Sequence, residues 1–167
     1  MNNRFLKSLA LTAALTAIAG AASAADNGVK SISAGAFPIS ASAKVPAGDE
    51  TIYVSGLTPS PLAPPAAGAA PAFGDTETQA ESVFKKIEEA LAAQGATAGD
   101  VVSMHVYLVG DPALGGKMDF AGMMKAYTRH FGTTTQPNKP TRTTVQVASL
   151  VGPGQLVEID CIAVKKP

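Results

Sequence analysis

One arginine and one glutamate near the C-terminus have side chains suited to chemistry. Arg142 lies in the run TRTTVQV, Glu158 lies in the run VEIDCIAV, and a Gly-Pro-Gly segment separates the two runs. A guanidinium binds a carboxylate through a planar fork of donors that lysine does not offer. A glutamate near such an arginine is either its salt-bridge partner or a group that positions a water and takes its proton. Spacing alone favours the salt bridge.

The two runs that carry these residues are predicted to be β-strands. In the first run Arg142, Thr144 and Gln146 alternate with residues of the opposite face, and in the second run Glu158 and Asp160 alternate with apolar residues. The Gly-Pro-Gly segment predicts a turn that joins them as an antiparallel pair. Each strand then has a polar-bearing face at its start.

Five further elements are predicted from composition and periodicity. Strands are expected at 51–56 and, more weakly, at 39–45, and a third strand rich in β-formers is expected at 100–110. Apolar residues three and four apart predict one helix over 74–95, capped by Asp75 or Thr76, and a second over 118–131. Residues 25–36 are expected to be a loose leader, and the proline-rich stretch 58–74 a surface excursion rather than a flap over a cleft.

The order of these elements predicts an α+β fold. A strand, helix and strand around the first helix indicate a right-handed crossover and a parallel pair. A mixed β-sheet with two helices on one face is the compact arrangement for a single domain over 25–167. The other face of the sheet is left uncovered, which suggests an oligomer.

Common catalytic and metal motifs are missing from the sequence. It has no phosphate-binding glycine loop, no C-x-x-C, no H-E-x-x-H and no G-x-S-x-G. We interpret His105 and His130 as structural, and we expect no metal site and no cofactor. Cys161 lies in an apolar strand pattern, so we interpret it as a small buried hydrophobic residue.

The N-terminus has the features of a secretory signal peptide. Arg4 and Lys7 precede a short apolar run, and Ala22-Ser23-Ala24 supplies the small residues of a cleavage site. Residues 1–24 are therefore predicted to be removed, without a stable membrane anchor, and the protein to be periplasmic or secreted. Removal leaves 11 basic against 13 acidic residues, a balance that argues against a nucleic-acid partner.

The sequence resembles the RidA family, also called the YjgF/YER057c/UK114 family. The C-terminal PTRTTVQVASL and VEIDCIAV are similar to that family's signature, YVSGLTP is similar to its strand with a Ser-Gly pair, and MDFAGMMKAYTRHFG to its second helix. The resemblance covers about residues 51–164. It implies a chorismate-mutase-like fold, a homotrimer whose sheets form a central barrel, and active sites in clefts between subunits.

The resemblance also implies an activity and site residues. The best-known branch hydrolyses enamines and imines such as 2-iminopropanoate to 2-oxo acids and ammonia, without metal or cofactor. By this resemblance Arg142 holds the substrate carboxylate, Glu158 positions and activates water, and Ser55, Gly56 and Thr144 line the pocket. Thr144 stands where the best-known members have cysteine. A tyrosine of the deaminase branch has no counterpart in PISASAKV, and the insertion 58–74 is atypical.

The sequence therefore supports a main hypothesis and alternatives to it. The main one is a trimeric imine deaminase that takes a small 2-imino acid. The first alternative is a trimer that binds small carboxylates without catalysis, and the missing tyrosine favours it. The ribonuclease activity described for some relatives fits an exported, slightly acidic protein least well, and a chaperone-like activity leaves no sequence trace.

Overall fold

The computed structural model describes residues 27–167, so the predicted signal peptide lies outside the described residues. The described chain forms one six-stranded sheet, two α-helices and two short 3-10 helices. The strands are β1 (Lys30–Ser33), β2 (Ser40–Lys44), β3 (Glu50–Leu57), β4 (Val101–Val109), β5 (Thr141–Val147) and β6 (Val157–Lys165). The helices are α1 (Thr76–Ala93), η1 (Ala98–Asp100), η2 (Pro112–Leu114) and α2 (Phe120–His130).

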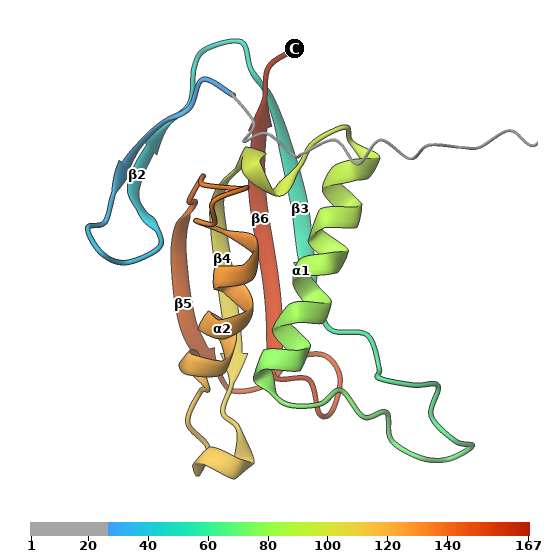
Figure 1. Cartoon of the computed structure of the whole chain (residues 1–167). Helices are drawn as coiled ribbons and strands as arrows, with labels where there is room; N and C mark the ends of the chain where they lie inside the picture. The colour runs from blue at the N-terminus through green and yellow to red at the C-terminus, as the bar shows by residue number, and fades with distance from the viewer. Residues whose placement is uncertain (1–26) are drawn as a thin grey trace, which may run out of the picture.

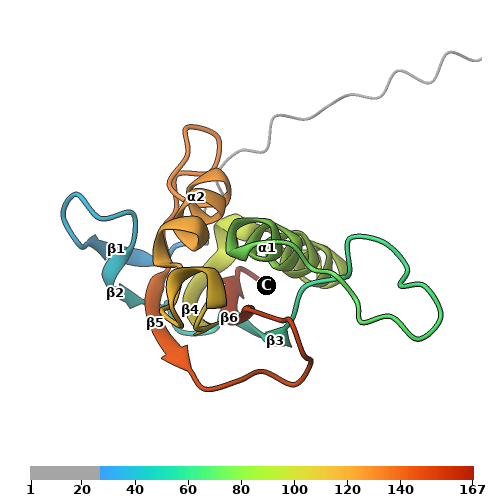
Figure 2. The same cartoon turned by 90° about the horizontal axis from the view of Figure 1, so that it is seen from below.

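The sheet is mixed, and its strand order is β1-β2-β5-β4-β6-β3. The pairs β2–β5 and β4–β5 are parallel, and β1–β2, β4–β6 and β3–β6 are antiparallel. Figures 1 and 2 show α1 and α2 side by side on one face of this sheet. This arrangement confirms the predicted α+β fold with two helices on one face. We call the uncovered side of the sheet the open face.

The predicted pairing of the last two strands was wrong. β4 lies between β5 and β6 and pairs with both of them. The connecting residues 148–156 form a long loop at one end of the sheet rather than a tight turn (Figure 1). Such a loop can pass β4 and lead from β5 into β6, because neighbouring strands lie only about 4.8 Å apart. Gly-Pro-Gly is therefore part of a crossing loop, not the centre of a hairpin.

Two other expectations about strands need correction. β3 and β4, on either side of α1, point the same way, but β6 is inserted between them, and the hydrogen-bonded parallel pair instead flanks α2. Residues 25–36 are not a loose leader throughout, because Lys30–Ser33 form β1. All four residues of β1 are exposed, so no apolar alternation marks it. Its pairing with β2 rests on backbone hydrogen bonds.

The two helices begin and end within two residues of the predicted bounds. The Asp75 carboxylate accepts a hydrogen bond from the Thr78 amide, and Asp119 does the same for Gly122. Apolar stripes of both helices pack against β4 and β6, and Cys161 is buried among them, as predicted. Burial raises the pKa of the Cys161 thiol to about 12. The largest core side chains include Phe84, Ile87, Leu91, Met104, Leu108, Met123, Tyr127, Phe131 and Ile159.

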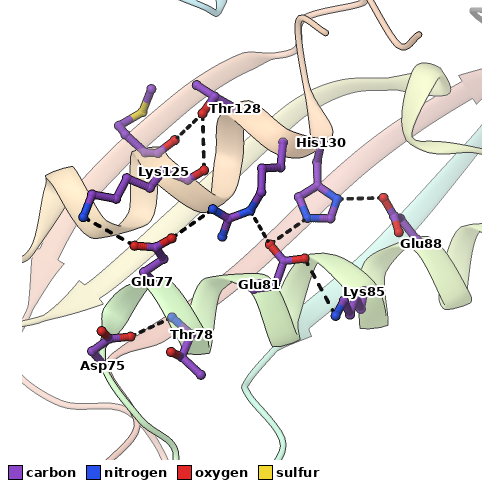
Figure 3. Close-up of polar contacts among 11 residues, drawn as sticks. Asp75, Glu77, Thr78, Glu81, Lys85, Glu88, Lys125, Thr128 and His130 are labelled. Atoms are coloured by element: carbon purple, nitrogen blue, oxygen red, sulfur yellow. Dashed lines mark hydrogen bonds and ion pairs between the residues drawn. The ribbon is translucent and has the colours of Figure 1, made fainter.

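His130 links the two helices as a structural residue, as predicted. Its Nδ1 lies 2.8 Å from the Glu88 carboxylate and its Nε2 lies 3.2 Å from Glu81 (Figure 3). Burial opposes the charged imidazolium, but these two carboxylates outweigh it and raise the pKa of His130. Arg129 adds ion pairs to Glu77 at 2.9 Å and Glu81 at 3.0 Å. This network holds α2 against α1, and the two helices together form the layer that packs on the sheet.

The proline-rich residues 58–74 form the expected surface excursion, which projects beside α1 (Figure 2). Both ends of the excursion are attached to α1. Lys86 Nζ donates to the Thr58 carbonyl at 2.7 Å, and the buried Gln79 amide donates to the Gly74 carbonyl at 2.9 Å. The same Gln79 donates to Gly154 at 3.0 Å and accepts from the Leu156 amide at 2.7 Å. Within residues 27–167, no helix is both long enough and apolar enough to span a bilayer.

Candidate active site

Arg142 belongs to β5, and its side chain lies on the helix-covered face of the sheet. Its neighbour on β4 is Met104, a core residue, and its guanidinium carbon lies 4.3 Å from the centre of the Tyr127 ring. The Phe120 ring, at the start of α2, lies 5.7 Å from the same carbon. β5 pairs with β2 only at Thr141. The guanidinium therefore lies against two aromatic rings, next to an edge of β5 that is largely unpaired within the described chain.

The guanidinium has strong donors that the described chain does not use. Nε and Nη1 of Arg142 are buried and have no hydrogen-bond partner among residues 27–167. Burial lowers the pKa of Arg142 from its ordinary value, since no carboxylate of the described chain pairs with it. A buried unpaired charge is unfavourable, and buried donors of native proteins are nearly always satisfied. The arrangement is ready for an anionic ligand.

Thr144 extends this polar row along β5. It pairs with the core residue Val106, so its side chain lies on the same face as Arg142. Its Oγ1 is buried and also lacks a hydrogen-bond partner within the described residues. One hydroxyl and two guanidinium nitrogens therefore remain unsatisfied on one strand. This is the feature that most clearly indicates a binding site for a polar ligand.

Ser55, Gly56 and Glu158 form a second group at the other edge of the sheet. Val54 pairs with Cys161 and Leu57 pairs with Ile159, so Ser55 and Gly56 together oppose a single residue of β6. This is a β-bulge, a feature that re-aims side chains beside functional sites. A Cβ at Gly56 would collide with the Glu158 carboxylate. Glycine thus allows this carboxylate to lie directly against the β3 backbone.

Glu158 lies on the open face of the sheet. It pairs with Tyr107, while Val157 and Ile159 on either side of it are buried in the core. Beside it, His105 Nδ1 lies 2.8 Å from Asp160 and the Tyr107 hydroxyl donates to Asp160 at 3.2 Å. Partial burial and the charge of Asp160 raise the pKa of Tyr107. The environment of Glu158 is therefore polar, and His105 has an acidic partner that the sequence did not indicate.

The five predicted site residues fall into two groups, not one. Arg142 and Thr144 lie on the helix-covered face of β5, whereas Glu158 lies on the open face of β6 with Ser55 and Gly56 nearby. β4 runs between β5 and β6. This excludes the salt bridge that the spacing favoured, because Arg142 makes no ion pair with any described residue. A single ligand that touches both groups needs side chains from two copies of the chain.

The sequence did not reveal the aromatic residues around Arg142. Phe120 and Tyr127 belong to the apolar stripe of α2, which was interpreted as core alone, and Phe37 lies in a loop with no pattern. The sequence signal for these contacts was an arginine on a strand that follows an aromatic-rich helix. Among the described residues, no group of three or more His, Cys, Asp and Glu side chains is placed to hold a metal ion.

Comparison with known proteins agrees with this architecture. A family model described as endoribonuclease L-PSP matches residues 36–165 of the chain. The chain belongs to this family, the RidA (YjgF/YER057c/UK114) family. A RutC family protein of Pyrococcus horikoshii is 34% identical over 93 residues, which are 56% of this chain and 65% of that protein. The chain thus matches less than two thirds of that relative's length.

Solved structures of RidA-family proteins are similar to the chain over most of its length. The crystal structure of Escherichia coli TdcF with bound serine is 30% identical, covers 73% of this chain and 85% of that chain, and has a TM-score of 0.54. A family member from Mycobacterium tuberculosis is 26% identical, covers 81% of this chain and 98% of that chain, and has a TM-score of 0.51. The fold and the family are thereby shown.

A Gly56→Ala substitution tests whether the bulge positions Glu158. The added methyl group would displace the carboxylate, and a shift of about 1 Å in a catalytic group can lower a rate about 100-fold. Gly56 does not have a positive φ, so alanine introduces no backbone strain there. We expect any activity that uses the Glu158 carboxylate to fall about 10- to 100-fold, with an unchanged thermal unfolding curve. Unchanged activity in Gly56→Ala would show that the activity does not depend on the position that the bulge gives to Glu158.

Proposed function

We propose that this protein is an imine deaminase that hydrolyses reactive 2-imino acids to 2-oxo acids and ammonia. The observation that carries the proposal is the set of unsatisfied buried donors, Nε and Nη1 of Arg142, beside the free hydroxyl of Thr144. In a guanidinium each of these nitrogens forms a fork with Nη2, and an α-carboxylate binds either fork bidentately. Membership of the RidA family supports the reaction class, and the Glu158 carboxylate held at the β3 bulge supports the water-handling step.

In the proposed reaction, Arg142 binds the carboxylate and thereby fixes the position of C2. Glu158 accepts a hydrogen bond from a water molecule and takes its proton as the water oxygen bonds to C2. The proton then passes to nitrogen and gives a carbinolamine. Its hydroxyl group gives up its proton to nitrogen as the C2–N bond breaks with its electron pair, so the C2=O bond of the 2-oxo acid forms and ammonia leaves. Positioning together with one general base contributes about 10²- to 10⁴-fold for the proton transfer. No electron donor or acceptor is required.

The site we propose is shared between two subunits of a homotrimer. The two groups of site residues lie on opposite faces and opposite sides of the sheet, so each interface between subunits combines Arg142 of one copy with Glu158 of the next. The open face also carries exposed apolar side chains, among them Tyr53, which is 78% exposed, and Val145, which is 40% exposed. Apolar residues on an uncovered sheet face favour burial against further copies.

A second candidate function is binding of small carboxylates without catalysis. The presence of bound serine in the similar TdcF structure supports it, because serine carries the α-carboxylate that Arg142 is suited to hold. The absence of a tyrosine from residues 38–45 removes one group that the deaminase branch carries. For either function we propose an exported protein, on the basis of the sequence of residues 1–24.

The experiment that tests the proposed function follows the fate of an imine. An amino-acid oxidase generates 2-imino acids from several amino acids, and semicarbazide traps whatever the protein does not hydrolyse first. We expect purified protein to lower the rate of semicarbazone formation. Semicarbazone formation that is unchanged on every amino acid, with 2-oxo acids still bound in calorimetry, would replace the deaminase by the carboxylate-binding function.

A further inference from the structure

An exposed aromatic side chain, Phe37, lies beside the aromatic rings that contact Arg142. Phe37 belongs to the loop between β1 and β2, and its ring stacks on Phe120 with 6.4 Å between ring centres and 22° between the planes. The Phe120 ring in turn lies 5.7 Å from the guanidinium carbon of Arg142. Phe37 is 46% exposed although it is apolar. The two rings form a continuous apolar surface that leads outward from the guanidinium, and we call it the Phe37–Phe120 wall.

The loop that carries Phe37 is fixed by the same residue that supports Arg142. The Tyr127 hydroxyl donates to the Pro38 carbonyl at 2.9 Å, and the Tyr127 ring lies under the guanidinium at 4.3 Å. The Ala34 amide donates to the Ile39 carbonyl at 3.1 Å and closes the loop. Ser40 then pairs with Thr141, next to Arg142 in the chain. The position of Phe37 relative to the guanidinium is therefore set by a hydrogen bond and a strand pairing.

A carboxylate bound to Arg142 leaves its substituent close to this wall. The buried nitrogens of Arg142 fix the carboxylate, and the neighbouring open surface is the Phe120 ring and then the Phe37 ring. Aromatic rings gain most from contact with other rings or with sizeable apolar groups. A benzyl group extends farther from the carboxylate than a methyl group does, so it can contact more of this wall.

We propose that Phe37 is a specificity-determining residue, and that the site prefers 2-imino and 2-oxo acids with a large apolar or aromatic side chain over those with a methyl group. This inference rests on the proposed function only in that Arg142 holds a carboxylate. Phe37, Phe120 and Arg142 belong to one chain, so the wall exists whichever subunit supplies Glu158. A wall of this kind discriminates by contact area, which distinguishes side chains by about 10-fold or more.

The test compares two 2-oxo acids as binding probes, phenylpyruvate and pyruvate, by calorimetry. We expect the wild-type protein to bind phenylpyruvate at least about 10-fold more tightly. Phe37→Ala should weaken phenylpyruvate binding and leave pyruvate binding unchanged, and Phe37→Leu should give an intermediate ratio. Leu62→Ala is the matched control, because it removes an apolar side chain that is 61% exposed on the distant 58–74 excursion. It should leave both affinities unchanged.

The outcomes separate this inference from the proposed function. Equal affinity of the wild type for the two acids, no binding of either acid, or an unchanged ratio in Phe37→Ala overturns the specificity role. A retained preference for phenylpyruvate without imine hydrolysis overturns the deaminase proposal and leaves the wall in place. The ratio of hydrolysis rates for phenylalanine- and alanine-derived imines should also fall in Phe37→Ala, by the same factor as the affinity ratio.

Discussion

Replacement of Arg142 by alanine is expected to abolish imine hydrolysis and 2-oxo acid binding while the protein stays folded. A charge-assisted hydrogen bond contributes about 1.5–3 kcal/mol, so loss of the two-pronged carboxylate contact should weaken binding about 100-fold or more. Arg142 pairs with no carboxylate of the described chain, so its removal leaves no buried partner unsatisfied. The loss of its contact with the Tyr127 ring is offset by removal of a half-buried, unpaired charge. Semicarbazone trapping, calorimetry and thermal unfolding measure the three quantities.

Two other variants make this result specific to Arg142. Arg142→Lys keeps the charge but not the planar fork, so binding should recover only in part. Arg129→Ala removes an arginine that pairs with Glu77 and Glu81 between the helices. It should lower the melting temperature by a few degrees at most, since exposed ion pairs contribute only about 0–1 kcal/mol, and it should leave the activity unchanged. Full activity of Arg142→Ala would remove Arg142 from the role of carboxylate ligand.

Mixed assembly of two inactive variants is expected to restore activity. Arg142→Ala and Glu158→Gln chains, expressed together, should form trimers in which some interfaces combine an intact Arg142 with an intact Glu158. With random assembly about a quarter of the interfaces have this combination, so the activity should approach about a quarter of the wild-type value. Each variant alone should be inactive. The reason is that β4 separates Arg142 from Glu158 and the two side chains lie on opposite faces of the sheet.

The control for this experiment is a chain that carries both substitutions. Arg142→Ala expressed together with the double variant has no interface with an intact Arg142, so no activity should return. Sedimentation should show the same assembly for all combinations. If the two single variants assemble together and remain inactive, both residues act from the same chain, and the shared site is excluded. If Glu158→Gln alone is fully active, Glu158 is not the base.

Local patterns in the sequence were sufficient to predict the helices and most of the strands. The apolar stripes and the Asp75 cap predicted α1 and α2 closely, because helix periodicity depends on neighbours a few residues apart. The position of β4 between β5 and β6 depends on contacts between distant segments, and the Gly-Pro-Gly segment indicated a hairpin instead. β1 has four exposed residues and no alternation, so its pairing with β2 left no pattern to detect.

The candidate site was predicted by residue type but not by geometry. The types of Arg142 and Glu158, together with the family resemblance, pointed to a carboxylate ligand and a base. Which face each side chain occupies depends on the strand register, and the salt bridge that the spacing favoured is absent between them. Phe37 was missed because it approaches Phe120 through loop folding, which no periodicity in the sequence records.

The attachments of the 58–74 excursion make it a natural place for this fold to gain or lose sequence. Lys86 and Gln79 of α1 hold its first and last carbonyl groups, and Gln79 also holds the loop that leads into β6. A longer or shorter connection between these two anchors changes the free energy of loop closure only slowly with length. It leaves the β3 bulge beside Glu158 where it is. Chains of this architecture can therefore diverge in this connection, and an inserted peptide tag or small domain would be tolerated there, without remodelling of the open face.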